Sequence, residues 1–134
     1  MAVALSEAVR KLLEGPNFAH LGTLMPDGSP QVTVVWVNLR GAHILINTAE
    51  GRQKPRNIRR DDRVALSVVN QENPYQTVAI RGRVVELTHD GADKHLDELS
   101  KKYLGQETYP YRQPGEQRIL VRIEPQYVTP YGLD

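Results

Sequence analysis

Short segments in which apolar and polar residues alternate recur along the chain, and residues typical of turns separate them. In segment 63–69, Val64, Leu66 and Val68 would share one face, because successive side chains of a β-strand point to opposite sides. The pattern predicts six strands, at residues 18–24, 30–39, 43–48, 63–69, 76–87 and 118–132. One apolar row from each strand can build the interior of a closed sheet, and closure removes exposed edges. We therefore expect an all-β fold with short helices, built as a six-stranded antiparallel barrel.

Glycine and proline mark where the chain turns or ends a helix. The turn at 26–29, Pro-Asp-Gly-Ser, joins the first two strands as a hairpin, since proline presets φ and glycine supplies a positive φ. Gly82 lies in the middle of a strand and predicts a bulge or a close approach of another backbone segment. Apolar residues at helical spacing predict a short helix before Gly15 and another over 91–104. Pro55 suits the first turn of a third short helix.

Length and composition narrow the class of protein. The chain has 134 residues, which predicts one domain over 1–134, and we find no internal repeat. The formal net charge is +1, so the overall charge does not indicate binding to nucleic acid or to a membrane surface. Cysteine is absent, which excludes disulfides and thiolate chemistry and fits a cytoplasmic protein. No apolar run reaches the roughly 18–20 residues of a membrane-spanning helix.

Common catalytic motifs are missing from the sequence. It contains no dinucleotide-binding glycine motif, P-loop, nucleophile elbow or zinc-protease motif. The four histidines are scattered along the chain, so we expect no metal site.

One basic segment stands out from this background. Residues 52–60 contain Arg52, Lys54, Arg56, Arg59 and Arg60 in nine positions. One interpretation is a solvated basic helix. The other is an anion site, because the free N–H groups and the dipole of a helix N-terminus favour a phosphate, and arginine offers a planar fork to its oxygens. Nucleic acid is a weaker candidate, since no aromatic residues are interleaved with these cations.

The second predicted strand is apolar on both of its faces. Thr33, Val35 and Val37 alternate with Val34 and Trp36. A strand that is apolar on both sides is usually covered on both sides, and in so small a barrel the outer cover would come from another subunit. We therefore expect a homodimer.

The order of elements and three sequence runs resemble the pyridoxamine-phosphate-oxidase-like split-barrel superfamily. These runs are PDGSPQ, GRQKPRNIRRDDRVALSV after the ILINT strand, and NPYQTVAIRGRV. The nearest match is the branch of reductases that use the deazaflavin coenzyme F-420. The resemblance extends from about Leu5 to about Gly132 and implies an FMN-binding-like split β-barrel.

The resemblance also implies where a cofactor would bind. In such relatives, the residues that match Arg52 and Lys54 hold the cofactor phosphate, while the strand after the PDG turn and the end of the third strand approach the ring. Family sites lie at the dimer interface, so the partner subunit supplies some of the contacts. Ten cofactor-binding residues follow: Gln31, Thr33, Val35, Asn47, Thr48, Arg52, Lys54, Arg56, Asn57 and Tyr75.

The implied activity is an oxidoreductase that transfers a hydride from reduced coenzyme F-420 to a small conjugated acceptor, such as an enone or a quinone. The cofactor carries this chemistry, so no catalytic side chain is expected. Tyr75, Tyr109 and Tyr111 are candidate proton donors, with solvent as the alternative. Two other interpretations stay open: an FMN-dependent oxidase or reductase of the same fold, and a flavin- or haem-binding protein without turnover.

Overall fold

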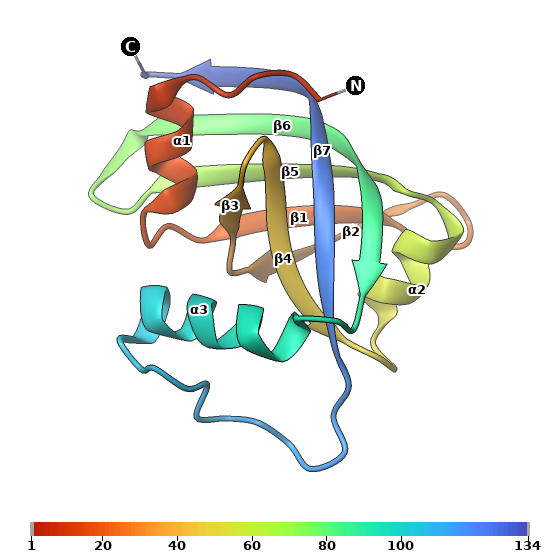
Figure 1. Ribbon diagram of the computed structural model, residues 1–134. Helices are drawn as coiled ribbons and strands as arrows, with labels where there is room; N and C mark the ends of the chain where they lie inside the picture. The colour runs from red at the N-terminus through yellow and green to blue at the C-terminus, as the bar shows by residue number, and fades with distance from the viewer. Residues whose placement is uncertain (1, 134) are drawn as a thin grey trace.

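The computed structural model of the protein describes residues 2–133. Three short helices accompany seven strands in this part of the chain (Figure 1). In chain order they are α1 (Glu7–Glu14), β1 (Ala19–Leu24), β2 (Pro30–Val35), β3 (Asn38–Arg40), β4 (His43–Ala49), α2 (Gln53–Arg60), β5 (Arg63–Asn70), β6 (Asn73–Thr88), α3 (Ala92–Leu104) and β7 (Arg118–Tyr131).

The strands form one antiparallel sheet in the order β2-β1-β5-β6-β7-β4-β3. The architecture is a split barrel, as the sequence predicts, but with seven strands rather than six. The difference lies in segment 30–39, which forms two strands at opposite edges of the sheet: β2 pairs with β1, and β3 pairs with β4.

Trp36 and Val37 form the crossover between these two edges. Their backbone leaves the sheet, and side chains of α3 replace the lost strand partners. The Val37 N–H donates to the Tyr103 hydroxyl at 3.1 Å, and the Val37 carbonyl accepts from the Lys102 ammonium. Because buried backbone groups need such partners, helix α3 allows the chain to change edges.

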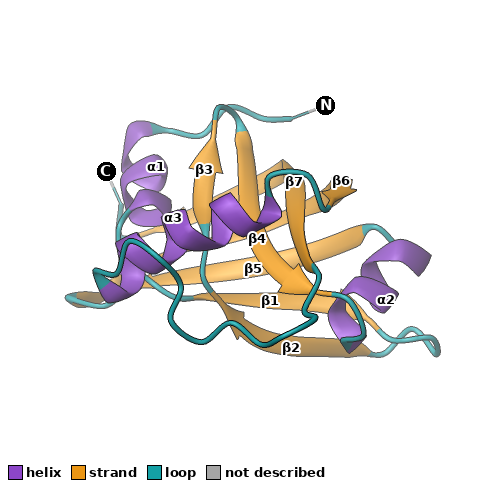
Figure 2. Ribbon diagram, turned by 60° about the horizontal axis from the view of Figure 1, so that its bottom comes forward, coloured by secondary structure: helices purple, strands orange, loops and turns teal. Residues whose placement is uncertain are grey.

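The interior of the barrel is built from the alternating apolar rows. The rows of β5, β6 and β7 are buried in a single core cluster. Val9, Leu12 and Leu13 of α1 close one end of this core. Helix α3 lies outside the barrel across β4 and β7, where Ala92 packs with Leu45 and Leu120 (Figure 2). Helix α2 packs against β1 and β4 at the end of the barrel opposite to α1.

Strands β6 and β7 are long, and they bend as they pass around the barrel (Figure 1). Their pairing shifts register at Arg81/Gly82 and again between Val84 and Glu86. The backbone carbonyl of Glu124 occupies the space where a side chain at Gly82 would begin. The predicted bulge and close approach at Gly82 are therefore both confirmed.

No helix in residues 2–133 combines the length and the apolar character needed to cross a membrane.

We expect Gly82→Ala to destabilise the protein by about 1–3 kcal/mol, because the new methyl group would push the Glu124 carbonyl away and disturb the pairing of β6 with β7. Gly22→Ala is the matched control, since its new methyl group would meet nothing closer than the Ala65 carbonyl at 3.6 Å. Urea denaturation at one protein concentration measures both variants. Equal midpoints for the two variants would contradict the close approach.

Candidate functional site

Three cationic side chains from separate parts of the sequence line one pocket. Arg52 is the N-cap residue of α2, Lys54 lies in its first turn, and Arg118 begins β7. The pocket has a volume of about 220 Å³. Its other walls come from the end of β2, from β4, from α3 and from the loop after α3, through Val34, Val35, Trp36, Asn47, Leu96, Leu99 and Tyr109.

The pairing of β4 with β7 brings these cations together. Ala49, the last residue of β4, lies opposite Arg118. Beyond it, the Glu50 N–H donates to the Gln117 carbonyl at 3.0 Å, and Gly51 then turns the chain into α2 with a φ of 89°. Arg118 and the first turn of α2 are therefore neighbours, although more than sixty positions separate them in the sequence.

Positive charge in the pocket exceeds negative charge. Glu116 is the one carboxylate paired with these cations among the described residues, at 3.2 Å from Arg118 and 3.6 Å from Arg52. Lys54 has no hydrogen bond or ion pair with any described residue. Burial, and then the nearby Arg52 and Arg118, lower the pKa of Lys54. A half-buried ammonium between two guanidinium groups is stabilised by an anion, so the pocket is suited to a phosphate or a carboxylate.

A chain of polar side chains, which begins with Asn47 in the pocket wall, supports Arg118. The Arg118 Nε donates to Asn47 Oδ1 at 2.8 Å, Asn47 Nδ2 contacts His95 Nδ1 at 3.1 Å, and His95 Nε2 contacts Asn38 Oδ1 at 2.8 Å. His95 has no exposed surface. Burial, followed by the charges of Arg40 and Arg118, lowers the pKa of His95 to about 4. The imidazole is therefore neutral at pH 7.

Aromatic side chains form another wall of the pocket. Trp36 stacks on Tyr103 with ring centroids 5.2 Å apart and meets the edge of Tyr109 at 6.0 Å. The Arg118 guanidinium lies 5.9 Å from the centre of the Tyr109 ring. Trp36 and Tyr109 thus offer flat surfaces beside the cations, where a planar ligand can stack.

Four of the ten predicted cofactor residues line this pocket: Val35, Asn47, Arg52 and Lys54. Gln31 and Thr33 lie on the same face of β2 as Val35. Thr33 and Thr48 each have a buried hydroxyl oxygen without a hydrogen-bond partner among the described residues.

Six of the ten predicted residues do not line the pocket: Gln31, Thr33, Thr48, Arg56, Asn57 and Tyr75. Arg56 is exposed and donates to the Gly51 carbonyl at 3.0 Å. Asn57 is fully buried and donates to the Thr23 hydroxyl at 3.0 Å, so its bonds tie α2 to β1. Tyr75 is 85% exposed and lies near the end of the β5–β6 pair that is remote from α2. Their cofactor contacts stay predictions, and for Tyr75 such a contact would have to come through a partner subunit.

Sequence reasoning missed several residues of the pocket. Arg118 was not predicted, because it starts the last strand, far from the basic segment in the sequence. Only the pairing of β4 with β7 brings it next to Arg52 and Lys54. Trp36 is predicted only as part of an apolar strand, and Leu96 and Leu99 only as part of the helix over 91–104. Tyr109 is predicted as a candidate proton donor but not as a wall of the pocket. The signal for Arg118 is a cation at the start of a strand, directly before the apolar run Ile119, Leu120 and Val121.

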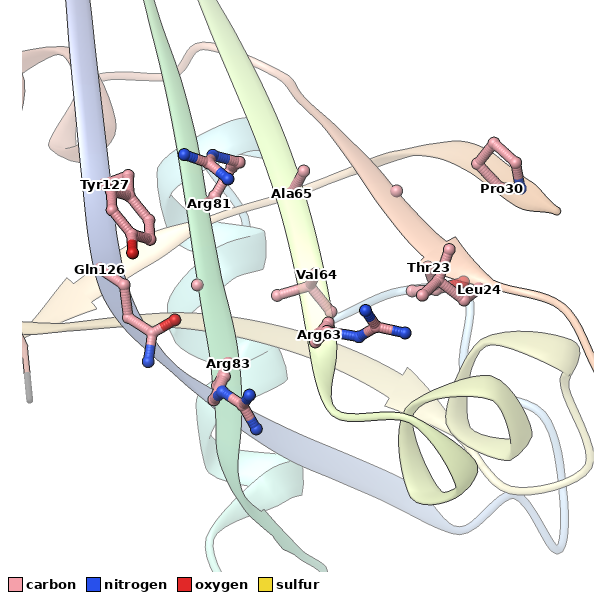
Figure 3. Close-up of a pocket in the computed structure, with 12 residues that line it drawn as sticks. Thr23, Leu24, Pro30, Arg63, Val64, Ala65, Arg81, Arg83, Gln126 and Tyr127 are labelled. Carbon is pink, nitrogen blue, oxygen red and sulfur yellow. The ribbon is translucent and has the colours of Figure 1, made fainter. Parts of the chain in front are cut away.

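A second hollow lies on the outer face of the sheet (Figure 3). It has a volume of about 420 Å³, and Arg63, Arg81 and Arg83 reach it from β5 and β6. Arg63 and Arg83 are paired with the neighbouring Asp61 and Asp62, at 2.7 and 3.0 Å. The Arg81 guanidinium instead lies 4.2 Å from the centre of the Tyr127 ring. These cations are therefore already neutralised or stacked, unlike Lys54.

An antiparallel split barrel with a cationic, aromatic-walled pocket defines the class of flavin-binding split barrels. The family model described as Pyridoxamine 5'-phosphate oxidase matches residues 5–131, and the chain belongs to this family. A solved structure titled F-420 reductase is 30% identical to this chain, with a TM-score of 0.82, and the match covers 93% of this chain and 98% of that one. The chain falls in the branch of the superfamily that contains this reductase.

More distant structures share the fold. A conserved hypothetical protein from Mycobacterium tuberculosis is 22% identical, with a TM-score of 0.73, over 97% of this chain and 86% of that one. A putative pyridoxamine 5'-phosphate oxidase from Lactobacillus delbrueckii is also 22% identical, with a TM-score of 0.67, and the match covers 94% of this chain and 93% of that one. No curated protein matches the sequence. Together, the family and the F-420 reductase structure indicate a flavin- or deazaflavin-related oxidoreductase.

The buried His95 makes stability depend on pH. In the unfolded chain its pKa has the ordinary value of 6.5, so the unfolded state takes up the proton first as the pH falls. The free energy of unfolding should therefore decrease between about pH 6.5 and about pH 4, by at most ~1.4 kcal/mol per pH unit from this group. Urea denaturation at a series of pH values measures this pH dependence of the free energy of unfolding. His95→Gln should lose this part of the dependence; an unchanged slope in that variant would contradict the assignment.

Proposed function

We propose that this protein transfers a hydride from the reduced deazaflavin coenzyme F-420 to a small conjugated acceptor, such as an enone or a quinone. The observation that carries the proposal is Lys54, a half-buried ammonium beside Arg52 and Arg118 that has no partner within residues 2–133. The likeness to a structure titled F-420 reductase supports it.

The residues present fit the phosphate end of such a cofactor. Arginine forks match phosphate oxygens, and the first turn of α2 adds backbone N–H groups that no side chain caps. Thr33 and Thr48 have buried hydroxyl oxygens without a partner among the described residues, but neither residue lines the pocket, so the fit rests on the cations and on these N–H groups. A pocket of about 220 Å³ holds a phosphate and the adjoining part of the cofactor, so the remainder must extend beyond it. Outside the pocket, the exposed Arg56 is a further cation of the same helix for a carboxylate-bearing tail.

The protein binds and orients, and the bound deazaflavin supplies the hydride. Arg52, Lys54 and Arg118 would hold its anionic end and would thereby orient the cofactor. Trp36 and Tyr109 provide flat, water-excluding walls. No side chain in the pocket is assigned a catalytic role; of the candidate proton donors only Tyr109 lines the pocket, and solvent delivers the proton in this proposal.

Paired titrations test the proposal. Apo-protein titrated with F-420 and with FMN should bind F-420 more tightly, and the preference should shrink as salt is added, because exposed charges are screened within about 8–10 Å. Stopped-flow oxidation of reduced F-420 by an enone then measures turnover. FMN binding at least as tight, with reduced F-420 inert across a panel of acceptors, would contradict the proposal. Turnover of bound FMN would then indicate an FMN-dependent enzyme. Absence of any FMN turnover would indicate a binding protein.

The same titration locates the phosphate. Lys54→Ala should weaken F-420 binding by roughly 1.5–3 kcal/mol, the scale of a lost charge-assisted hydrogen bond. Arg59→Ala is the matched control, because it removes one charge from the same helix while Arg59 is occupied by Glu50 at 2.7 Å. Equal affinity of wild type and Lys54→Ala would mean that the phosphate binds elsewhere.

We further propose that the protein is a homodimer that pairs through the outer face of β2, β1 and β5–β7. Val32 and Val34 are 63% and 60% exposed there. Beside Val32, small side chains such as Ala65 and Ala79 line an apolar hollow of about 450 Å³. A second copy is the occupant that the two-sided apolar strand β2 favours, and it would cover these valines in both subunits at once.

Val32→Asp should convert the dimer to a monomer, because it places a charge in the proposed interface and does not touch the cationic pocket. Sedimentation should show wild type near twice 15.1 kDa at micromolar concentration and the variant near 15.1 kDa. A wild-type protein that sediments only as a monomer would rule the proposal out.

A further inference from the structure

We infer that His95 is a positioning residue of the cofactor site: acting through Asn47, it fixes the direction in which the Arg118 guanidinium faces the anionic ligand. The inference rests on the proposed function, because it concerns the same pocket. His95 itself does not line that pocket; its neighbours on α3, Leu96 and Leu99, do.

Asn47 is the link between the histidine and the cation. Its Nδ2 donates to the Ala92 carbonyl at 2.8 Å and lies 3.1 Å from His95 Nδ1. Its Oδ1 accepts from Arg118 Nε at 2.8 Å. Every side-chain polar group of Asn47 is thus used, and each partner comes from a different place in the fold: the helix backbone, the imidazole and the guanidinium.

These partners allow only one orientation of the Asn47 amide. If the amide were rotated by half a turn, Oδ1 would face the Ala92 carbonyl and the unprotonated Nδ1 of His95, and Nδ2 would face a guanidinium N–H. All three contacts would become repulsive. The unprotonated His95 Nδ1 therefore acts with the Ala92 carbonyl to keep Oδ1 directed at Arg118.

Asn38 selects the required tautomer of His95. Its Oδ1 accepts from the imidazole Nε2–H at 2.8 Å, which leaves Nδ1 as the acceptor for Asn47. The charged groups that act on the imidazole are Arg40 and Arg118, and both disfavour its protonation. Complete burial has the same effect. The imidazole is consequently held neutral, in the single form that the relay needs.

Arg118 is the end of this relay. It is only 8% exposed; its Nε is held by Asn47, and its Nη1 lies 3.2 Å from Glu116. The Nη2 amino group donates no hydrogen bond to any described residue. It is the part of the guanidinium left for a ligand in the pocket that Arg118 lines. A guanidinium held by a hydrogen bond at Nε and by the ion pair with Glu116 has little freedom to turn, which reduces the entropy lost when an anion binds.

Two substitutions at His95 test the relay. His95→Leu removes the acceptor and should weaken F-420 binding roughly 10-fold, the scale of one mispositioned charge-assisted hydrogen bond. His95→Gln can accept from Asn47 and donate to Asn38, so it should recover affinity to within about 3-fold of wild type. His89→Gln, at an exposed histidine outside the pocket, is the control and should bind like wild type. In an Arg118→Ala background, His95→Leu should cause no further loss.

Asn38→Asp supplies a readout that a purely structural role would not change. A carboxylate at Nε2 stabilises the imidazolium and raises the pKa of His95, and the protonated Nδ1–H would then oppose Asn47 Nδ2. The ratio of variant to wild-type dissociation constants for F-420 should therefore rise as the pH falls from about 7 to about 5. A constant ratio, with His95→Leu binding as tightly as wild type, would overturn the relay alone. A wild-type protein that binds neither F-420 nor FMN would overturn the proposed function as well.

Discussion

Strand β7 is the element on which the rest of the structure depends. It pairs with β6 along its length, and its first half pairs also with β4, so it joins the two parts of the split barrel. To serve both neighbours it must bend, and the bulges opposite it in β6, with the missing side chain at Gly82, make that bend possible. The same pairing sets Arg118 beside the start of α2. Fold and candidate site are therefore consequences of one register.

That register concentrates charge in a place where water is partly excluded. Two of the three cations, Arg52 and Arg118, share the Glu116 carboxylate, and Lys54 has no partner among the described residues. Such an arrangement costs free energy in the ligand-free protein, because burial and like charges both disfavour the ammonium. An anionic ligand reverses this cost, which explains why a site can be built from groups that otherwise destabilise the fold. The outer-face arginines lack this property, since each is paired or stacked.

Much of the fold could be predicted from the sequence, because alternation reports which face of a strand is buried. The rows of β5 and β7, the helix over 92–104 and the close approach at Gly82 all followed from residue types and spacing. The break at Trp36 and Val37 did not, because both residues fit a continuous strand and only partners on α3 make the crossover favourable.

The candidate site was predictable in part for the same reason. Arg52 and Lys54 belong to a local run of cations, which a sequence displays directly. Arg118 and His95 enter the site through strand register and helix packing, which link distant positions. Asn57 illustrates the converse: it lies within the basic segment 52–60, yet its side chain is buried and ties α2 to Thr23. Proximity in sequence did not decide which polar groups face the pocket.

The central claim is that Arg52, Lys54 and Arg118 together hold the phosphate of a deazaflavin cofactor. A crystal structure of the protein with oxidised F-420 tests this most directly. The account predicts phosphate oxygens within hydrogen-bond distance of the Lys54 ammonium and of the Arg118 guanidinium. A phosphate bound instead among Arg63, Arg81 and Arg83 on the outer face, with only solvent beside Lys54, would contradict it.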